Sequence, residues 1–236
     1  MFDPIRQDQA YHRFADARVF LGIENAADVL SNVPFLVIGA IGLVLLWRTR
    51  QRSGFVLPEE ARAYWLLFGA VVLTGFGSIY YHLAPDDARL IWDRLPIAIA
   101  FMALLSAVIA ERVNANAGIR LLPALFLIGA ATVFYWAVFD DLRPYLVLQF
   151  GAIAGIFAVC VWFPSRYTRG SDLLVAVATY AAAKVAEALD TQIYGFGEFV
   201  SGHTLKHLMA ALAIGWLLRM LYSRRINLPS SARPTR

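Results

Sequence analysis

Charged residues are scarce in this sequence. Only 16% of its 236 residues are charged, and 59% are hydrophobic. Soluble globular domains carry about 25% charged residues, so the composition argues against a soluble protein. The hydrophobic residues also lie in long runs, and a helix needs a run of about 20 apolar residues to cross a bilayer. The sequence therefore predicts a polytopic membrane protein.

Cysteine and lysine are almost absent. The single cysteine, Cys160, excludes an intramolecular disulfide and is expected to pack in the core. Apart from Lys184 and Lys206 the 21 basic residues are arginines, and these are scattered at the ends of hydrophobic runs. Nucleic-acid binding needs a basic stripe or patch, so the net charge of +4 predicts no such partner. The N-terminal region lacks the hydrophobic segment of a cleavable signal peptide.

Seven hydrophobic runs predict an all-α bundle of seven transmembrane helices, because a chain in lipid pairs its backbone polar groups within each helix. The expected spans are residues 29–48, 62–82, 91–110, 120–139, 145–163, 171–190 and 203–222. They form one membrane domain, residues 1–226, which begins with a polar segment at 1–28. Residues 227–236 are expected to be a short disordered tail. Prolines 34, 96 and 123 are expected in first turns, where proline is best tolerated.

The distribution of basic residues predicts the orientation. Seven spans place 13 basic residues on the face that carries the C-terminus and seven on the other face. Because basic residues are enriched in cytoplasmic loops, the C-terminus is predicted to be cytoplasmic and the N-terminus exoplasmic. Arginine richness and short loops favour a bacterial inner membrane as the location.

Three of the four histidines lie at helix ends that this topology brings to one depth, near the outer face. His82 ends the second span, and His203 and His207 begin the last. Residues four apart lie on the same face of a helix, with about 6 Å of rise between them. Three histidines that leave a fourth position for water are typical of catalytic zinc, whereas structural zinc is usually closed by a fourth protein ligand. The alternative for each single histidine is an interfacial packing residue.

Ser78 and Asp93 belong to the same layer. Ser78 precedes His82 by one turn, and Asp93 begins the next span. The aspartate is suited to accept a proton or to orient a histidine ligand, and the serine to donate a hydrogen bond to an oxyanion. Two alternatives stay open: Ser78 is also explained by small-residue helix packing beside Gly75 and Gly77, and Asp93 by the positive end of a helix.

At this point the sequence resembles the alkaline ceramidases and their bacterial relatives, within a superfamily that includes the adiponectin and progestin receptors. Residues 77–96 (GSIYYHLAPDDARLIWDRLP) resemble the second and third spans of that family. Residues 201–208 (SGHTLKHL) resemble its His-x3-His segment, and residues 31–39 (SNVPFLVIG) its first span. The resemblance implies zinc held by His82, His203 and His207, with Ser78 and Asp93 beside the catalytic water. It also implies a lipid substrate and hydrolysis of ceramide to a sphingoid base and a fatty acid.

The resemblance also raises the question of calcium, which animal alkaline ceramidases bind through an acidic N-terminal segment. Asp16, Glu24, Asn25 and Asp28 offer oxygen ligands here, but their spacing departs from the animal pattern. The alternative is that these residues are solvated or cap helices.

Charged residues also lie within the sixth span. Lys184 and Glu187 are three residues apart and are expected to pair on one face of the helix. Asp190, closer to the outer face, is a candidate for support of the zinc layer. The sequence leaves the roles of all three residues open.

Two other function classes are weighed against the hydrolase. A lipid-binding receptor of the adiponectin-receptor type needs a sizeable soluble face, but the inner loops are short, and no obligate protein partner is predicted. A metal transporter needs ligands at several depths, whereas these histidines occupy one layer. Chain-length preference, the choice between amide and ester, and the oligomeric state lie beyond the sequence.

Overall fold

The computed structural model describes residues 3–49 and 54–227, and the regular elements of these residues are all helices. The predicted tail lies outside them, apart from Asn227. Seven helices are long: α2 (Val33–Thr49), α3 (Ala61–Leu83), α4 (Asp87–Arg112), α5 (Ala115–Phe139), α6 (Arg143–Trp162), α7 (Ser171–Ala188) and α9 (Gly202–Ser223). The short elements are α1 (Ala26–Leu30), α8 (Asp190–Tyr194) and the 3-10 helices η1 (Gln9–His12) and η2 (Pro58–Glu60).

Six helical segments of the described chain are long and apolar enough to cross a membrane, which supports a multi-pass membrane protein. The first of these combines α1 and α2, and the others contain α3, α4, α5, α6 and α9. The remaining long helix, α7, has 18 residues but carries Asp172, Lys184 and Glu187. Charges within a membrane segment are costly, so α7 is less suited to contact with lipid than the other six helices.

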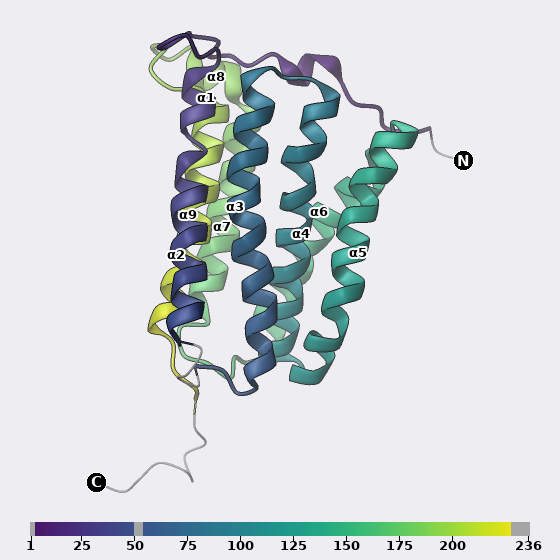
Figure 1. Ribbon diagram of the computed structural model, residues 1–236, viewed down its shortest axis with the longest axis vertical. Coiled ribbons are helices and arrows are strands. Elements are labelled where there is room, and N and C mark those ends of the chain that lie inside the picture. Colours follow the sequence, from purple (N-terminus) through teal and green to yellow (C-terminus); the bar gives the residue numbers. More distant parts are fainter. Residues whose placement is uncertain (1–2, 50–53, 228–236) are drawn as a thin grey trace, which may run out of the picture.

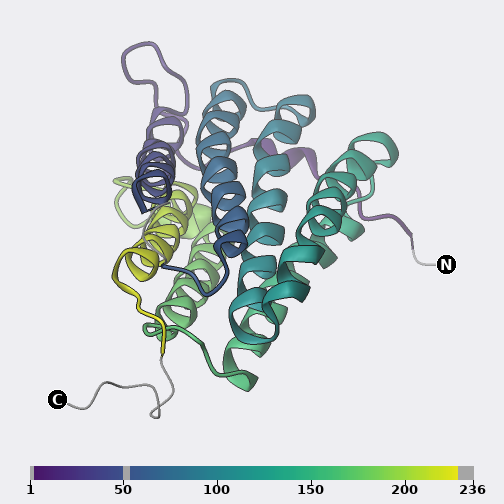
Figure 2. The same ribbon diagram turned by 60° about the horizontal axis from the view of Figure 1, so that its bottom comes forward.

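The long helices lie side by side in a bundle (Figure 1). The N-terminal segment crosses the end of the bundle where α1 and α8 lie, and the chain leaves α9 at the opposite end (Figure 1). Helix α4 contacts α3, α5 and α6, and α9 contacts α2 and α7. Both views place α2 and α9 on one side of the bundle and α5 on the other (Figure 2).

The core of the bundle contains two clusters of buried side chains. One surrounds Tyr64 and Phe68 of α3, and the other surrounds Tyr81, Leu90 and Trp136 near the end that the N-terminal segment crosses. Large apolar side chains also point outward and are exposed. This outward apolar surface suits contact with lipid chains rather than with water.

Helices α3 and α4 approach each other closely beside the candidate site. A Cβ atom added to Gly77 would lie 2.0 Å from the carbonyl oxygen of Trp92. Pro96 lies inside α4, nine residues after Asp87, and has no N–H to offer that carbonyl. The prediction that Pro96 and Pro123 lie in first turns was therefore wrong, because α4 and α5 begin earlier than the hydrophobic runs do. Pro34, by contrast, lies directly after Val33 at the beginning of α2.

A buried ionic cluster joins the helices at the end away from the N-terminal segment. Arg224, just after α9, pairs with Glu111 of α4, which also accepts a 2.6 Å hydrogen bond from the hydroxyl of Tyr64. The guanidinium lies over the rings of Phe55, Tyr64 and Tyr167, with 4.1 Å to the centroid of the last. Such contacts stabilise a desolvated arginine and hold α9 against α3 and α4.

Candidate metal centre

Three buried histidines meet near the end of the bundle that the N-terminal segment crosses. His82 lies in the last turn of α3, and His203 and His207 lie in the first turns of α9. Their ring centroids are 4.8 to 4.9 Å apart, and one ligand atom from each lies within 4.8 Å of the others. Each histidine is less than 5% exposed. The predicted cluster is therefore present, and it can hold a metal ion.

Local structure fixes the beginning of α9 and hence the positions of two histidines. Ser201 is the N-cap, and its side chain accepts a hydrogen bond from the N–H of Thr204 at 3.0 Å. The N–H of His203 donates to Asp190 Oδ1 at 2.7 Å. A Cβ atom on Gly202 would lie 2.1 Å from the carbonyl oxygen of Ala186, so only glycine allows α9 to begin this close to α7.

The hydrogen bonds of the rings indicate which nitrogens can bind a metal. Oγ of Ser31, which donates to the carbonyl of Asp28, lies 2.8 Å from Nδ1 of His207, and Nδ2 of Asn32 lies 3.4 Å from the same nitrogen. These neighbours occupy Nδ1, so Nε2 is the nitrogen of His207 that is left for a metal.

At His203, Nε2 accepts a hydrogen bond from Nζ of Lys206 at 3.0 Å, because an ammonium only donates, so Lys206 has to move aside for this nitrogen to bind a metal. The Nδ1 atom of His82 is buried without a hydrogen-bond partner. Neutral imidazoles, one of them with an unpaired buried nitrogen, are a donor set that fits a transition-metal ion.

Replacing Ser31 with alanine is expected to weaken metal binding by about 10- to 100-fold, because the serine orients His207. The measurement is competition with a chromophoric chelator. Ser106→Ala is the matched control, since Ser106 is a buried serine that donates to the carbonyl of Gly118 at 2.9 Å, away from the site. Equal metal affinities of the two variants would contradict the orienting role of Ser31.

Ser78 and Asp93 lie where the sequence predicts them. Both are buried, and the hydroxyl of Ser78 lies near the Asp93 carboxylate. Together with His207 they line the same cavity, to which α3, α4 and α9 each contribute. A proton acceptor and a hydroxyl donor therefore face the same space as a metal ligand.

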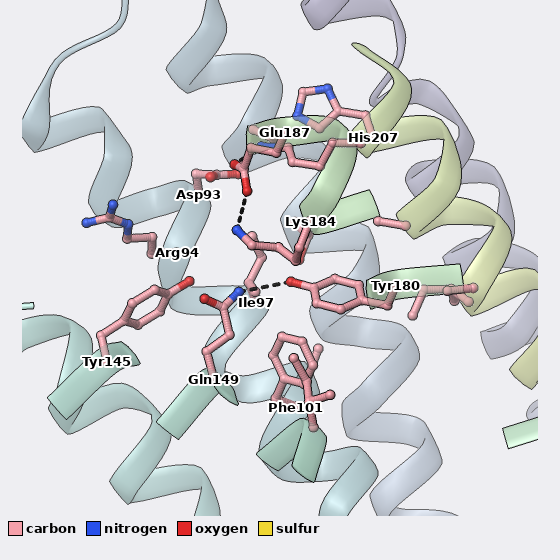
Figure 3. A pocket seen from close by; sticks show the side chains of 18 of the residues that line it. Asp93, Arg94, Ile97, Phe101, Tyr145, Gln149, Tyr180, Lys184, Glu187 and His207 are labelled. Atoms are coloured by element: carbon pink, nitrogen blue, oxygen red, sulfur yellow. Dashed lines mark hydrogen bonds and ion pairs between the residues drawn. The ribbon is translucent and has the colours of Figure 1, made fainter. Parts of the chain in front are cut away.

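The cavity has a volume of about 640 Å³ and extends away from the histidines into the bundle. Its walls are mostly apolar, and its polar residues gather in layers. Asp93, Glu187 and His207 lie together at one level in Figure 3, and Tyr145, Gln149 and Tyr180 form another level beyond Lys184. A mostly apolar cavity with a few polar groups is typical of a binding site for a small molecule.

The N-terminal segment covers the site. The ring centroid of Phe14 lies 4.6 Å from that of His82 and 4.7 Å from that of His203. Other residues of the segment line the cavity. Two aspartates between α5 and α6 hold the segment in place: Asp140 accepts from the N–H of Gln7 at 3.2 Å, and Asp141 from the N–H of Ile5 at 3.3 Å. This acidic pair therefore anchors the cover.

The anchor is expected to be stable at neutral pH and to weaken in acid. Hydrogen bonds from Arg143 hold the pKa of Asp141 at about 2, below the usual aspartate value of about 3.9. Because the folded pKa is depressed, this contribution is complete above about pH 4 and is lost as the pH falls towards 2. Hydrogen exchange of the Ile5 amide, which donates to Asp141, measures it after correction for intrinsic rates. Asp141→Asn removes the charge that Arg143 pairs with and should lower the protection of this amide already at pH 7. Protection in the variant equal to that of the wild type would argue against the anchor.

The charged residues of α7 form a network beside the metal centre. Lys184 pairs with Glu187, as the sequence predicts, and Lys206 of α9 donates to the same carboxylate at 2.9 Å. Asp190 also accepts from the N–H of Ala15 at 3.0 Å, in addition to its bond with His203. It thus joins the N-terminal segment to the metal layer, which supports its suggested role.

The four residues suggested for calcium do not share one environment. Asp16 forms a two-pronged pair with Arg18, which lowers the pKa of this carboxyl, and Glu24 is exposed. Asn25 donates to the carbonyl of His82 at 3.1 Å, and Asp28 accepts from Thr204 at 2.6 Å. Within residues 3–49 and 54–227, the three histidines are the only group of histidine, cysteine and acidic side chains arranged to share an ion. Calcium stays a prediction.

Several residues of the site escaped sequence reasoning. Phe14 and Lys206 contact the histidines only in the folded chain, so the sequence does not predict them. The sequence includes Ser31 only as part of a first-span motif, whereas the structure places it against His207. Lys206 had one available signal, because it lies in the same turn as His203 and His207 and its charge requires a partner in lipid. The fourth histidine, His12, contacts Tyr81 and Asp87 instead of the cluster.

Comparison with known proteins gives no family for this chain: no protein-family model matches it, and no curated protein shows significant similarity to it.

Proposed function

We propose that this protein is a zinc-dependent membrane hydrolase that cleaves the N-acyl bond of a ceramide-like lipid. The observation that carries the proposal is a cluster of three histidines able to hold a metal, one of which, His207, lines a mostly apolar cavity together with a carboxylate and a hydroxyl. A lipid-binding receptor of the adiponectin-receptor type is the alternative, and a stoichiometric cytoplasmic partner recovered in a pull-down would favour it.

Zinc is favoured by the donor set. Three imidazoles without a thiolate are typical of catalytic zinc, which keeps a position for water. When bound, such an ion lowers the pKa of water to about 7 and polarises a carbonyl group. Proton transfer and orientation of the substrate are then the roles of the side chains that line the cavity.

Asp93 acts as general base and then as general acid. Its carboxylate accepts the proton that the attacking water releases and delivers it to the nitrogen of the leaving amine. The single hydroxyl proton of Ser78 is directed to the carboxylate before the attack; once Asp93 has taken up the proton of the water, the Ser78 hydroxyl donates to the oxygen of the scissile carbonyl. The N-terminal segment, with Phe14 against the histidine rings, limits access of bulk water.

The substrate class rests on the resemblance to alkaline ceramidases and on the cavity. An apolar cavity of about 640 Å³ suits a long aliphatic chain, and the metal layer at its end suits a polar amide near the membrane surface. A different acylated lipid is the nearest alternative. An ester analogue of the same chain length tests amide against ester directly.

The same proposal includes the topology. Lys184 of α7 is paired within the helix, and Glu187 is also paired with α9, so the main charges near its end are compensated in the bundle interior. We infer a seventh crossing by α7, with the N-terminus and the metal layer at the exoplasmic face and the C-terminus cytoplasmic. Part of the arginine bias behind this orientation comes from Arg50, Arg52, Arg233 and Arg236, which lie outside the described residues. We further propose a bacterial inner membrane as the location.

The test measures metal content and turnover in one preparation. The full chain is purified in detergent, its metals are quantified by mass spectrometry, and fatty-acid release from a fluorescent ceramide is followed. Zinc at about one ion per chain with turnover supports the proposal. Zinc without turnover rejects ceramide, and an active protein that contains no zinc rejects the mechanism.

Calcium is tested separately. If the N-terminal residues bind it, a calcium-selective chelator that leaves zinc in place should lower both the melting temperature and the turnover, because a ligand bound only to the folded state stabilises it. Added calcium should restore both. Unchanged values would remove calcium from the proposal without affecting the zinc centre.

A further inference from the structure

A second polar layer lies within the apolar cavity, apart from the metal centre. Tyr145 and Gln149 extend from α6 and Tyr180 from α7, and all three line the cavity. Tyr180 precedes Glu187 of the metal layer by seven positions, which corresponds to about 10 Å along the helix. Figure 3 shows the three side chains converging at one level, with Phe101 beyond them.

The three side chains of this layer retain unused hydrogen-bonding capacity. Gln149 donates its amide N–H to the hydroxyl of Tyr180 at 2.9 Å, but its Oε1 atom has no partner among the described residues. The Tyr180 hydroxyl proton is likewise uncommitted, and the hydroxyl of Tyr145 makes no hydrogen bond within the described chain. Gln149 is 6% exposed and Tyr145 is 5% exposed, and both line the cavity, so a group that occupies the cavity can reach these unpaired atoms.

The chemistry of the missing partner follows from these groups. The layer offers one amide oxygen as an acceptor and two phenol hydroxyls as donors, and none of the three groups is ionised. The charges nearest along α7 and α4 are Lys184, which pairs with Glu187, and Arg94, which donates through Nη2 to Gln7 at 2.7 Å. The Arg94 guanidinium lies 5.3 Å from the centroid of the Tyr145 ring, and its buried Nη1 has no hydrogen-bond partner in the described part of the chain. A neutral group that both donates and accepts complements this set, whereas a charged group does not.

We infer that Gln149, Tyr180 and Tyr145 form a subsite for a hydroxyl group on the aliphatic chain of the bound lipid. The inference rests on the proposed function for the identity of the lipid, but the subsite is defined by its own contacts. The chain hydroxyl donates to Gln149 Oε1 and accepts from a tyrosine hydroxyl. Its distance from the metal layer places it several methylenes from the scissile bond, towards the middle of a long chain.

Lipids that are not hydrolysed test the subsite without turnover. Displacement of a fluorescent lipid from the full-length, metal-loaded protein in detergent is compared for two pairs: stearic acid against a mid-chain hydroxystearic acid, and a sphingoid base with and without an extra chain hydroxyl. The hydroxylated member of at least one pair should bind about five- to tenfold more tightly, as one or two buried neutral hydrogen bonds allow. The pair that shows the preference identifies which chain occupies this part of the cavity.

Two variants connect the preference to the layer. In Gln149→Leu and in Tyr180→Phe, the two lipids of a pair should have nearly equal dissociation constants. Each variant should bind the lipid without the extra hydroxyl at least as well as the wild type does. Tyr222→Phe, on an exposed tyrosine of α9, is the control and should keep the ratio. Melting temperatures show whether each variant is folded, and a merely structural contact between α6 and α7 would change stability but not the ratio.

Equal binding within both pairs in the wild type overturns the subsite, since water would then be the partner of these groups. A preference that persists in both folded variants overturns it as well. Failure of the proposed function is seen separately, as absent fatty-acid release from ceramide by a protein that still prefers the hydroxylated lipid.

Discussion

The His203→Ala variant is expected to lose its bound metal and its turnover together. His203 is buried and contributes one of three imidazoles whose ligand atoms lie within 4.8 Å of each other. Two histidines hold a zinc ion far more weakly than three, because a catalytic site has no fourth protein ligand to compensate. The metal content, measured by mass spectrometry after dialysis, should fall from about one ion per chain to background.

The control for this experiment is His12→Ala. His12 is the fourth histidine, and it contacts Tyr81 and Asp87 outside the cluster, so its loss should leave the metal in place. Folding is checked by melting in the presence and absence of a zinc chelator. The chelator should lower the melting temperature of wild type and His12→Ala but not that of His203→Ala. A folded His203→Ala variant with a full complement of metal would contradict the site.

The Asp93→Asn variant is expected to keep its metal and lose turnover by about 10²- to 10⁴-fold, which is the usual contribution of a general base. An amide is nearly the same size as a carboxylate and can still accept a hydrogen bond from Ser78, but it does not take up a proton at neutral pH. The loss should fall on kcat, because the carboxylate acts on a proton in transit rather than on the binding of the lipid chain.

Asp86→Asn is the matched control. Asp86 caps α4 by accepting from the N–H of Arg89 at 2.7 Å, and asparagine is an equally good N-cap. Both variants thus replace an aspartate by asparagine near the beginning of α4. Asp93 faces the cavity, whereas Asp86 lies at the surface. Turnover by Asp93→Asn at the level of Asp86→Asn would remove the aspartate from the chemistry while leaving the metal centre intact.

The sequence by itself determined the helical class, the positions of the helices and the residues of the metal cluster. Hydrophobic runs of bilayer length have few alternatives to helix, since backbone groups must be paired within the segment. The cluster followed for the same reason: four predicted crossings, an even number, lie between His82 and His203 and return the chain to the same face, where the end of one helix lies beside the beginning of the other. Helix ends were missed where polar residues continue the helix beyond the run, as at Asp87 and Ala115.

Tertiary structure alone decided how the site is supported and covered. The bonds of Ser31 to His207 and of Lys206 to His203 depend on the rotation of each helix about its axis, which a nearly uniform hydrophobic run does not specify. The path of the N-terminal segment over the histidines depends on contacts with residues more than 130 positions away, as between Gln7 and Asp140. The polar layer around Gln149 could not be predicted for the same reason, because its hydrogen-bonding groups lie on separate helices and only the packing of these helices brings them to one level.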